Sequence, residues 1–472
     1  MPTRTRLSLA IALALASQYA AAASTQFDNF TPLAASSPAN PTGSPLETTT
    51  PLTLSSPKFK QQVIAQRNTQ TGLGQFNSGA WDMITTNETG PDAGRYLFTV
   101  FESGQSGVQR TDTWNNNATQ TLWRSPAAGG HVAFDASYWT PWGSFITAEE
   151  SWTTAPGGAT TNPYGRLYEM TNPLSSNITP NFVHRNVIPR TSHEGIQFDQ
   201  ANHMYFIDEL NGGNVYRYSS AAGAGSSYFD AGKTSVLRIG DGNTPNATGA
   251  FSWVDITDAS GNGLAGTLTI TDPNGVVSLD ARNTTDLAAF KGTDYQRPED
   301  LQIKRAANGD ELLFMATTTT NEVYTVNLTS GMVSVFADRN TINLHDNLAV
   351  GSPDFTSPDN LAMDAAGNIY IIEDQPGGMA DIWFAKDTNH DGDLNDAGEG
   401  LALWASMNTN GAEPTGLYFD PFNPNRAWLN IQHPASGNDV MVELTAVPLP
   451  AALPLSLSAL AALGLVARRR TA

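Results

Sequence analysis

The sequence predicts an all-β fold, a six-bladed β-propeller with loop insertions. From about residue 70 to about residue 445, short runs of aromatic and β-branched residues are separated by Gly, Asn, Asp and Pro, with almost no helical periodicity. One hairpin pattern also recurs six times over this stretch. Regular repetition of one hairpin favours radial closure over the alternative, a β-sandwich, because closure leaves only short, protected strand edges.

The recurring pattern is a turn, a strand ending in polar or acidic residues, a Gly/Asn loop and a second strand. The first strands are expected within residues 94–102, 143–150, 203–209, 310–318, 367–374 and 426–433. Second strands are clearest at 214–218, 321–326 and 381–384. Each pair is expected to form part of one blade.

The two ends of the chain differ in composition from the middle. Residues 1–23 carry two arginines, an apolar run and a small-residue stretch, which is typical of a secretory signal peptide. Residues 24–69 begin rich in Thr, Ser, Pro and Ala, and we expect a flexible lead-in. The propeller is expected over residues 70–446, followed by a separate segment over 447–472.

That last segment resembles a PEP-CTERM sorting tail. It begins Val447-Pro-Leu-Pro-Ala, continues as an apolar run and ends with three arginines at 468–470. The resemblance implies export across the inner membrane of a Gram-negative bacterium, processing by an exosortase-type enzyme, and delivery to the cell surface or extracellular matrix. The alternative is a simple membrane anchor, since the run is just long enough to span a bilayer. Either way, the body of the protein is expected outside the cytoplasm.

Charge and cysteine content exclude several kinds of protein. The net charge is −20, and none of the acidic residues lies in the two terminal segments. Such a surface repels phosphate backbones, so nucleic acid is not expected as a partner. The chain has no cysteine, which excludes a disulfide scaffold, an iron–sulfur cluster and a cysteine nucleophile. Any metal must be held by oxygen or imidazole ligands.

A second pattern places an acid just before a short hydrophobic strand. The four acids are Glu194, Glu299, Asp359 and Glu413. In a propeller the innermost strands of all blades start at the same end of the central channel, so these carboxylates are expected to converge. Converging carboxylates persist only if protonated or bridged by cations, and hard oxygen ligands favour Ca²⁺ first, then Mg²⁺, Mn²⁺ or oxidised iron. The alternative is that each acid caps a turn.

Several segments in the same order also resemble the PhoX-type alkaline phosphatase family. They are 140–150 (Thr-Pro-Trp-Gly-Ser-Phe-Ile-Thr-Ala-Glu-Glu), 193–195 (His-Glu-Gly), 297–300 (Arg-Pro-Glu-Asp), 358–361 (Pro-Asp-Asn-Leu), 413–416 (Glu-Pro-Thr-Gly) and 431–434 (Ile-Gln-His-Pro). The resemblance covers roughly residues 75–445. It implies a six-bladed propeller whose central site holds calcium and two oxo-bridged ferric ions and hydrolyses phosphate monoesters. It also implies metal ligation by Glu150, Glu194, Glu299 and Asp359.

One position departs from the family pattern. Five residues before the Thr-Pro-Trp-Gly stretch the family has a metal-bridging cysteine, and this chain has Asp135. A carboxylate can bridge two hard cations but is a weaker donor to iron than a thiolate. We therefore expect Asp135 to ligate metal in either a calcium-dominated site with several Ca²⁺ ions or a different metal pair, with Fe³⁺ possible.

The predicted catalytic residues are Arg297 and Glu299. By resemblance Arg297 holds the substrate phosphate, and a planar guanidinium suits two phosphate oxygens. The alternative is a structural salt bridge from Arg297 to Asp300 or Glu299. Five further residues are predicted to support the site by contacting either the metal ligands or the substrate: Glu149, His193, Asn360, Glu413 and His433. For both histidines the competing interpretation is a buried structural histidine.

A local pattern predicts a separate structural calcium loop. Asp387, Asn389, Asp391, Asp393 and Asn395 occupy alternate positions as in an EF-hand-like loop, with Gly392 sixth and Glu399 thirteenth. The alternative is a solvated acidic turn.

Together these features predict an exported, monomeric enzyme that hydrolyses a small-molecule phosphate ester at the mouth of the propeller channel. Two other functions stay open: a calcium-dependent lactonase-type propeller hydrolase, and a non-catalytic surface or matrix protein in which calcium only stiffens the fold.

Overall fold

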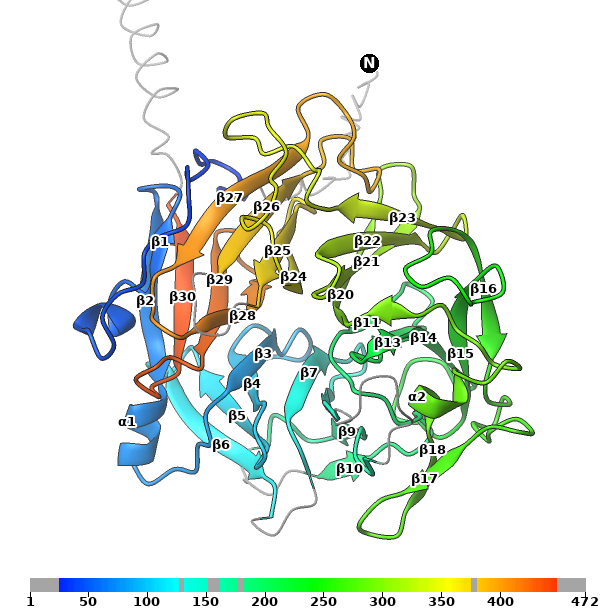
Figure 1. Ribbon diagram of the computed structural model, residues 1–472. Helices are drawn as coiled ribbons and strands as arrows, with labels where there is room; N and C mark the ends of the chain where they lie inside the picture. Colours follow the sequence, from blue (N-terminus) through cyan, green and yellow to red (C-terminus); the bar gives the residue numbers. More distant parts are fainter. Residues whose placement is uncertain (1–24, 127–130, 152–161, 176–180, 375–379, 448–472) are drawn as a thin grey trace, which may run out of the picture.

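The computed structural model describes residues 25–126, 131–151, 162–175, 181–374 and 380–447. Over these residues the protein is a ring of β-sheets around a central axis (Figure 1), which confirms the predicted all-β propeller. The predicted signal peptide and residues 448–472 of the predicted tail lie outside the described residues. Within them, no helix is long and apolar enough to cross a membrane.

Six blades form the ring, each with four antiparallel strands that follow from the inside outward. The first is β3 (Trp81–Thr86), β4 (Tyr96–Phe101), β5 (Gly107–Asp112) and β6 (Ala118–Arg124). The second is β7 (Phe134–Trp139), β8 (Phe145–Glu149), β9 (Leu167–Met170) and β10 (Phe182–His184). The third is β11 (Ile196–Phe198), β12 (Met204–Ile207), β14 (Val215–Ser220) and β15 (Gly232–Ile239), to which β16 (Gly249–Asp255) adds a fifth strand.

The fourth blade is β20 (Pro298–Arg305), β21 (Glu311–Thr317), β22 (Glu322–Asn327) and β23 (Met332–Ala337). It is joined to the third by pairing between β16 and β23. The fifth is β24 (Pro358–Met363), β25 (Ile369–Glu373), β26 (Asp381–Lys386) and β27 (Gly400–Met407), and β1 (Leu52–Leu54) lies against its outer edge. The sixth is β28 (Glu413–Phe419), β29 (Arg426–Gln432), β30 (Val440–Ala446) and β2 (Phe59–Gln66).

Short elements decorate this ring. The strands β13 (Asn211–Gly213) and β19 (Tyr295–Gln296) pair with each other, as do β17 (Thr269–Thr271) and β18 (Val277–Leu279). The helices are a 3₁₀ turn over Pro45–Thr48, α1 (Arg67–Gly72) and α2 (Ala281–Thr284).

The innermost strands close the ring. Each of β3, β7, β11, β20, β24 and β28 contacts the next, and β28 contacts β3. Aromatic and aliphatic side chains fill the space between neighbouring blades, for example Phe98 against Phe145 of the next blade, with ring centroids 5.0 Å apart. This packing holds the starts of the six inner strands at one end of a common channel.

The predicted lead-in over residues 24–69 needs correction. Residues 59–66 form β2, which pairs along β30 and supplies the outer strand of the last blade. Phe27 is fully buried against Phe59 and Trp404. The last blade takes only three strands from the C-terminal part of the chain, so the N-terminal segment pairs with the edge that would otherwise be open. The propeller therefore begins well before residue 70.

Candidate metal centre

Each of the six innermost strands has an acid within two residues of its start: Asp82, Asp135, Glu194, Glu299, Asp359 and Glu413. In β3, β7, β20 and β24 the register with the second strand shifts across this position. Such β-bulges redirect a side chain out of the regular pleat. Ring closure then brings acids from all the blades to one end of the channel.

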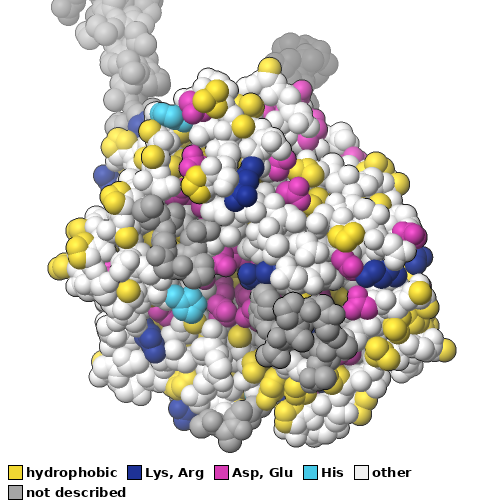
Figure 2. Space-filling model, viewed as in Figure 1, with side chains coloured by type: hydrophobic (Ala, Val, Ile, Leu, Met, Phe, Trp, Pro, Cys, Tyr) yellow, Lys and Arg dark blue, Asp and Glu magenta, His cyan; other side chains and the backbone are white. Residues whose placement is uncertain are grey.

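The second strand of each blade returns to the same end and adds another polar residue at or just past its last position. These residues are Glu102, Glu150, Glu209, Thr318, Asp374 and His433. Acidic side chains accordingly gather near the centre of the face in Figure 2, next to basic side chains.

In the part of the chain that the structure describes, three groups of side chains bring ligand atoms within 4.8 Å of one another. They are the Asp135 group (Asp135, Glu150 and Glu209), the Glu194 group (Glu194, Glu299 and Asp359) and the Glu102 group (Glu102, Glu413 and His433). Each group combines residues from more than one blade. The predicted metal ligands Asp135, Glu150, Glu194, Glu299 and Asp359 all lie in the first two groups.

The Asp135 and Glu194 groups fit hard cations. Their buried oxygens Asp135 Oδ1, Glu194 Oε2, Glu209 Oε2 and Glu299 Oε2 accept no hydrogen bond from the described residues. Burial, and after it the neighbouring carboxylates, raises the pKa of Asp135, Glu194, Glu209 and Asp359 well above the usual range. Carboxylates packed in this way need protons or cations, and a donor set without thiolate suits hard metal ions.

The Glu102 group lies nearer the surface. His433 is about half exposed, and its Nε2 lies 4.0 Å from Glu102 Oε2. Gln432 donates to Glu102 Oε2 at 3.2 Å and also to Glu413. Burial, followed by the charge of Asp374, raises the pKa of Glu413 well above its usual range. The structure thus places His433 and Glu413 beside each other at the edge of the acidic centre.

Arg297 lies between the Asp135 and Glu194 groups. Its Nη2 is 2.7 Å from Glu209 Oε1, and its Nε is 3.2 Å from Glu299 Oε1. The salt bridge to Glu299 that the sequence offered as an alternative is therefore present, together with one to Glu209. Asp300 instead accepts from the backbone N–H groups of Leu301 and Leu361. The Arg297 side chain is 27% exposed, so it borders both acid groups and remains accessible.

A hydrogen-bonded network supports the acids from within the channel. Asn360 donates to Glu194 Oε1 at 3.2 Å and accepts from Thr415 Oγ1 at 2.5 Å, which also contacts Asp82. Thr318 donates to Glu299. The predicted supporting role of Asn360 thus corresponds to a direct contact with a candidate ligand.

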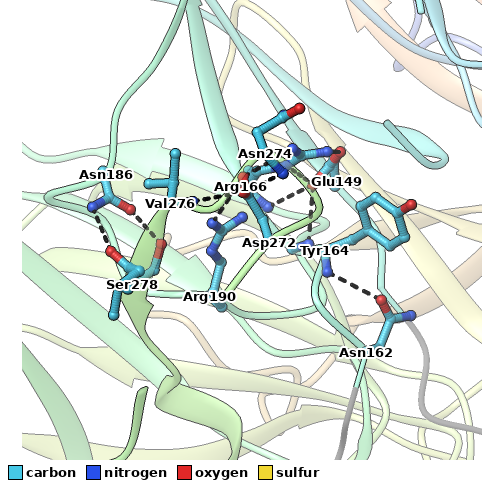
Figure 3. A network of polar contacts seen from close by, with 12 residues as sticks. Glu149, Asn162, Tyr164, Arg166, Asn186, Arg190, Asp272, Asn274, Val276 and Ser278 are labelled. Carbon is cyan, nitrogen blue, oxygen red and sulfur yellow. Dashed lines mark hydrogen bonds and ion pairs between the residues drawn. The ribbon is translucent and has the colours of Figure 1, made fainter. Parts of the chain in front are cut away.

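Glu149 and His193 belong to none of the three acid groups found among the described residues. Glu149 is buried in an ion pair with Arg166, with Oε1 2.6 Å from Nη2 (Figure 3). His193 packs on Phe206 with ring centroids 5.4 Å apart, and burial followed by Arg282 and Arg190 lowers its pKa to about 3. Both ring nitrogens of His193 are buried without a hydrogen bond from the described residues, and the supporting roles of Glu149 and His193 stay predictions.

Sequence reasoning missed several acids of the centre. Asp82, Glu102, Glu209 and Asp374 were not among the predicted site residues. Glu102, Glu209 and Asp374 end three of the strands that the recurring hairpin pattern predicted. The acidic residue at the end of each of these strands was therefore a signal in the sequence that could have identified them. Asp82 follows Trp81 in an inner strand that lacks the Pro or His found in the other patterns.

The predicted calcium loop over residues 387–399 is held by protein contacts. Asp387 Oδ2 pairs with Lys304 Nζ at 2.9 Å, and both side chains are buried. Glu399 Oε1 accepts from the Thr388 backbone and hydroxyl. Asn389 donates to Asp391 and Asp396. None of these carboxylates joins a candidate metal group among the described residues, and the calcium loop stays a prediction.

Comparison with protein families agrees with this geometry. The model of the alkaline phosphatase PhoX family matches residues 74–435. The chain belongs to the PhoX alkaline phosphatase family. The resemblance inferred from the sequence motifs is confirmed, and the protein is a phosphatase. No curated protein matches the chain.

Solved structures agree on the fold. PhoX from Pseudomonas fluorescens, determined in complex with vanadate, a transition-state analogue, shares 15% identity with a TM-score of 0.59. The alignment covers 88% of this chain and 98% of that one. A gluconolactonase from Xanthomonas campestris aligns over 88% of this chain and 99% of its own at 11% identity, but its TM-score is only 0.43. The first match supports the propeller, and the second carries no weight for function.

Proposed function

We propose that this PhoX-family phosphatase is an exported, metal-dependent enzyme that hydrolyses small-molecule phosphate monoesters where the acids converge at the channel end. The observation that carries the proposal is the position of Arg297. Its guanidinium contacts Glu209 of the Asp135 group and Glu299 of the Glu194 group and is partly exposed. An arginine held between two acid groups can receive an anionic ester that the acids alone would repel.

The Asp135 and Glu194 groups are the proposed metal ligands. Bound cations would neutralise the carboxylates, polarise phosphoryl oxygens and lower the pKa of coordinated water. The chain's own residues orient this chemistry: Asn360 and Thr318 hydrogen-bond Glu194 and Glu299 and so fix the direction of their free oxygens. Arg297 offers a fork of N–H donors to two phosphoryl oxygens.

The donor set favours calcium as the main cation. All ligands of the Asp135 and Glu194 groups are carboxylates, and Asp135 stands where the resemblance implies a bridging cysteine. Several Ca²⁺ ions are proposed, with Fe³⁺ retained only if Asp135 can bridge iron.

The proposed location rests on the two ends of the sequence. Residues 1–23 are proposed to direct export, and residues 447–472 to be processed by an exosortase-type enzyme at the inner membrane. The folded body would then act at the cell surface or in the extracellular matrix as a monomer.

Elemental analysis of the purified full chain, run beside hydrolysis of a chromogenic phosphate monoester, tests this function. We expect several calcium ions per chain and turnover with calcium alone, and a parallel assay with calcium plus iron shows whether iron adds activity. Glu299→Gln and Arg297→Met are both expected to abolish turnover. Arg426→Met is the matched control, because this arginine has similar exposure and pairs with Asp420 at the start of β29, the end of that strand away from His433.

Full metal occupancy with no hydrolysis of any phosphate ester would contradict the proposal and favour a calcium-stiffened binding protein. Undiminished hydrolysis of a lactone by Arg297→Met, without phosphatase activity in the wild type, would instead favour the lactonase-type alternative.

A further inference from the structure

Arg190, in the segment between β10 and β11, is a buried arginine whose guanidinium makes no hydrogen bond with the described residues. Its side chain is 0% exposed, and Nε, Nη1 and Nη2 all lack a hydrogen-bond partner there. The nearest carboxylate oxygen, Asp272 Oδ2, is 3.6 Å from Nη2, beyond hydrogen-bonding distance. A guanidinium has five N–H donors, and burying them unsatisfied is strongly unfavourable. Such a group calls for an acceptor that protein atoms do not supply.

Asp272 is already engaged by other donors. It lies in the turn between β17 and β18, where Oδ1 accepts from the backbone N–H groups of Asn274 and Val276 at 2.9 Å each. Its Oδ2 accepts from Arg166 Nη1 at 3.2 Å, and Arg166 also forms the paired contact with Glu149 (Figure 3). One carboxylate therefore faces two arginines, and its short contacts go to Arg166.

Two histidines with unsatisfied ring nitrogens pack on Tyr168, as does Arg166. His184 of β10 and His131 both pack on the Tyr168 ring, with centroids 5.5 and 4.9 Å away, and the Arg166 guanidinium carbon lies 5.4 Å from the Tyr168 centroid. His184 Nε2 and His131 Nδ1 are shut off from solvent and have no hydrogen-bond partner in the part of the chain that the structure describes.

At His184 the positive charges of the two arginines outweigh that of the nearby carboxylate. Burial, then the charges of Arg190 and Arg166, lowers the pKa of His184 to about 3, and Asp272 opposes them less strongly. Burial, followed by the charge of Arg166, likewise lowers the pKa of Arg190 to about 10. A water molecule could accept from the Arg190 guanidinium, but an anion would accept more strongly and would also offset the positive potential at His184.

We propose that Arg190, with His184 and His131 around Tyr168, binds a small inorganic anion of the halide or oxyanion class in a closed site of the second blade. The unsatisfied nitrogens are closed to solvent, so the ligand must be small, and chloride is the first anion to test. The site is separate from the acid groups at the channel end, and the proposal does not depend on the chemistry there.

Thermal unfolding of the full chain at constant ionic strength tests the site. Sodium chloride, bromide, sulfate and phosphate are compared with sodium gluconate, whose anion is too large to enter. We expect chloride to raise the midpoint saturably, by roughly 2–5 °C. Arg190→Met is expected to lose this response and to be at least as stable as the wild type in gluconate, because it removes buried N–H donors that have no acceptor there.

Arg185→Met is the matched control, since Arg185 lies close in sequence but pairs with Glu169. It should keep the chloride response. A response only to phosphate or sulfate that Arg190→Met abolishes would identify an oxyanion site, whereas a phosphate response retained in Arg190→Met would place that ion elsewhere and contradict the proposal.

A crystal of the wild type soaked in bromide gives an independent measurement that does not require a folded variant. An anomalous peak within hydrogen-bonding distance of the Arg190 guanidinium supports the site. The absence of a peak there, or no anion-specific stabilisation of the wild type, overturns it.

Discussion

Arg297 combines an unusual backbone conformation with an unusual position. Its φ is +54°, in the left-handed region that non-glycine residues adopt at a cost of roughly 1 kcal/mol. This conformation immediately precedes β20 and directs the guanidinium toward Glu209 and Glu299 rather than along the strand. Local strain retained beside a cluster of acids is consistent with a role in binding substrate.

Arg297→Lys tests whether the shape of the guanidinium matters as well as its charge. Lysine keeps the charge but cannot offer two parallel N–H donors to one phosphoryl group. We expect kcat/KM for a phosphate monoester to fall about 10²-fold, as when one transition-state donor is removed, with inhibition by inorganic phosphate weakened as well. Steady-state kinetics and phosphate inhibition measure both. Wild-type kinetics in the lysine variant would reduce Arg297 to a structural ion pair.

Asp135 is the residue at which this chain departs from its family. Its Oδ1 is buried and accepts no hydrogen bond from the described residues, in a group with Glu150 and Glu209. We expect Asp135→Cys to increase the iron content of protein prepared with iron and to produce a visible absorption band from ferric thiolate, because thiolate is the stronger donor. Asp135→Ser, which supplies neither donor, is the control. Equal iron in the cysteine and serine variants would show that this position does not select the metal.

At the scale of elements, the N-terminal strand decides whether the ring is closed. β2 covers the whole length of β30, and Phe59 at its start packs on Phe27 and Trp404 with centroids 5.6 and 5.5 Å away. Without β2 the last blade would expose an edge of unpaired backbone groups. The strand therefore links the start of the body to its end.

Phe59→Ala measures this closure. Phe59 is 4% exposed, and truncation of a buried Phe costs about 3–5 kcal/mol in the free energy of unfolding. Lys60→Ala, at the exposed neighbouring position of the same strand, should change stability by no more than about 0.5 kcal/mol. Denaturant unfolding of both variants gives the comparison. Equal effects of the two substitutions would show that the segment contributes little to the fold.

The recurring hairpins were readable from the sequence because period-two alternation and turn residues are local signals. The pairing of β2 with β30 was not, because no local signal links residues some 380 positions apart. The same alternation could have separated Glu149 from Glu150: neighbours in a strand face opposite ways, so only Glu150 joins the Asp135 group while Glu149 pairs with Arg166. A repeated local pattern, an acid just before a short hydrophobic strand, predicted Glu194, Glu299, Asp359 and Glu413. Asp82 lacks that pattern, and its place at the channel end follows only from closure of the ring.

At the scale of the whole molecule, an acidic chain concentrates carboxylates at its centre. The net charge is −20, and every innermost strand contributes an acid to the channel end. Without cations, burial and mutual repulsion raise the pKa of Asp82 to about 7 and those of Asp135, Glu194 and Asp359 well above the usual range. Stability must therefore depend on both metal and pH.

The sign of this dependence follows from proton binding. In the unfolded chain these acids titrate near pH 4, so the metal-free folded state binds more protons than the unfolded state above that pH. Its stability is fully present near pH 4 and is lost as the pH rises through the raised pKa values, including that of Asp82 at about 7. We expect a chelator to lower the unfolding midpoint by several °C more at pH 9 than at pH 5, and excess calcium to restore it. A fall of the same size at both pH values would mean that the acids are neutralised by protein contacts rather than by metal, and a midpoint insensitive to chelation at every pH would contradict the metal centre itself.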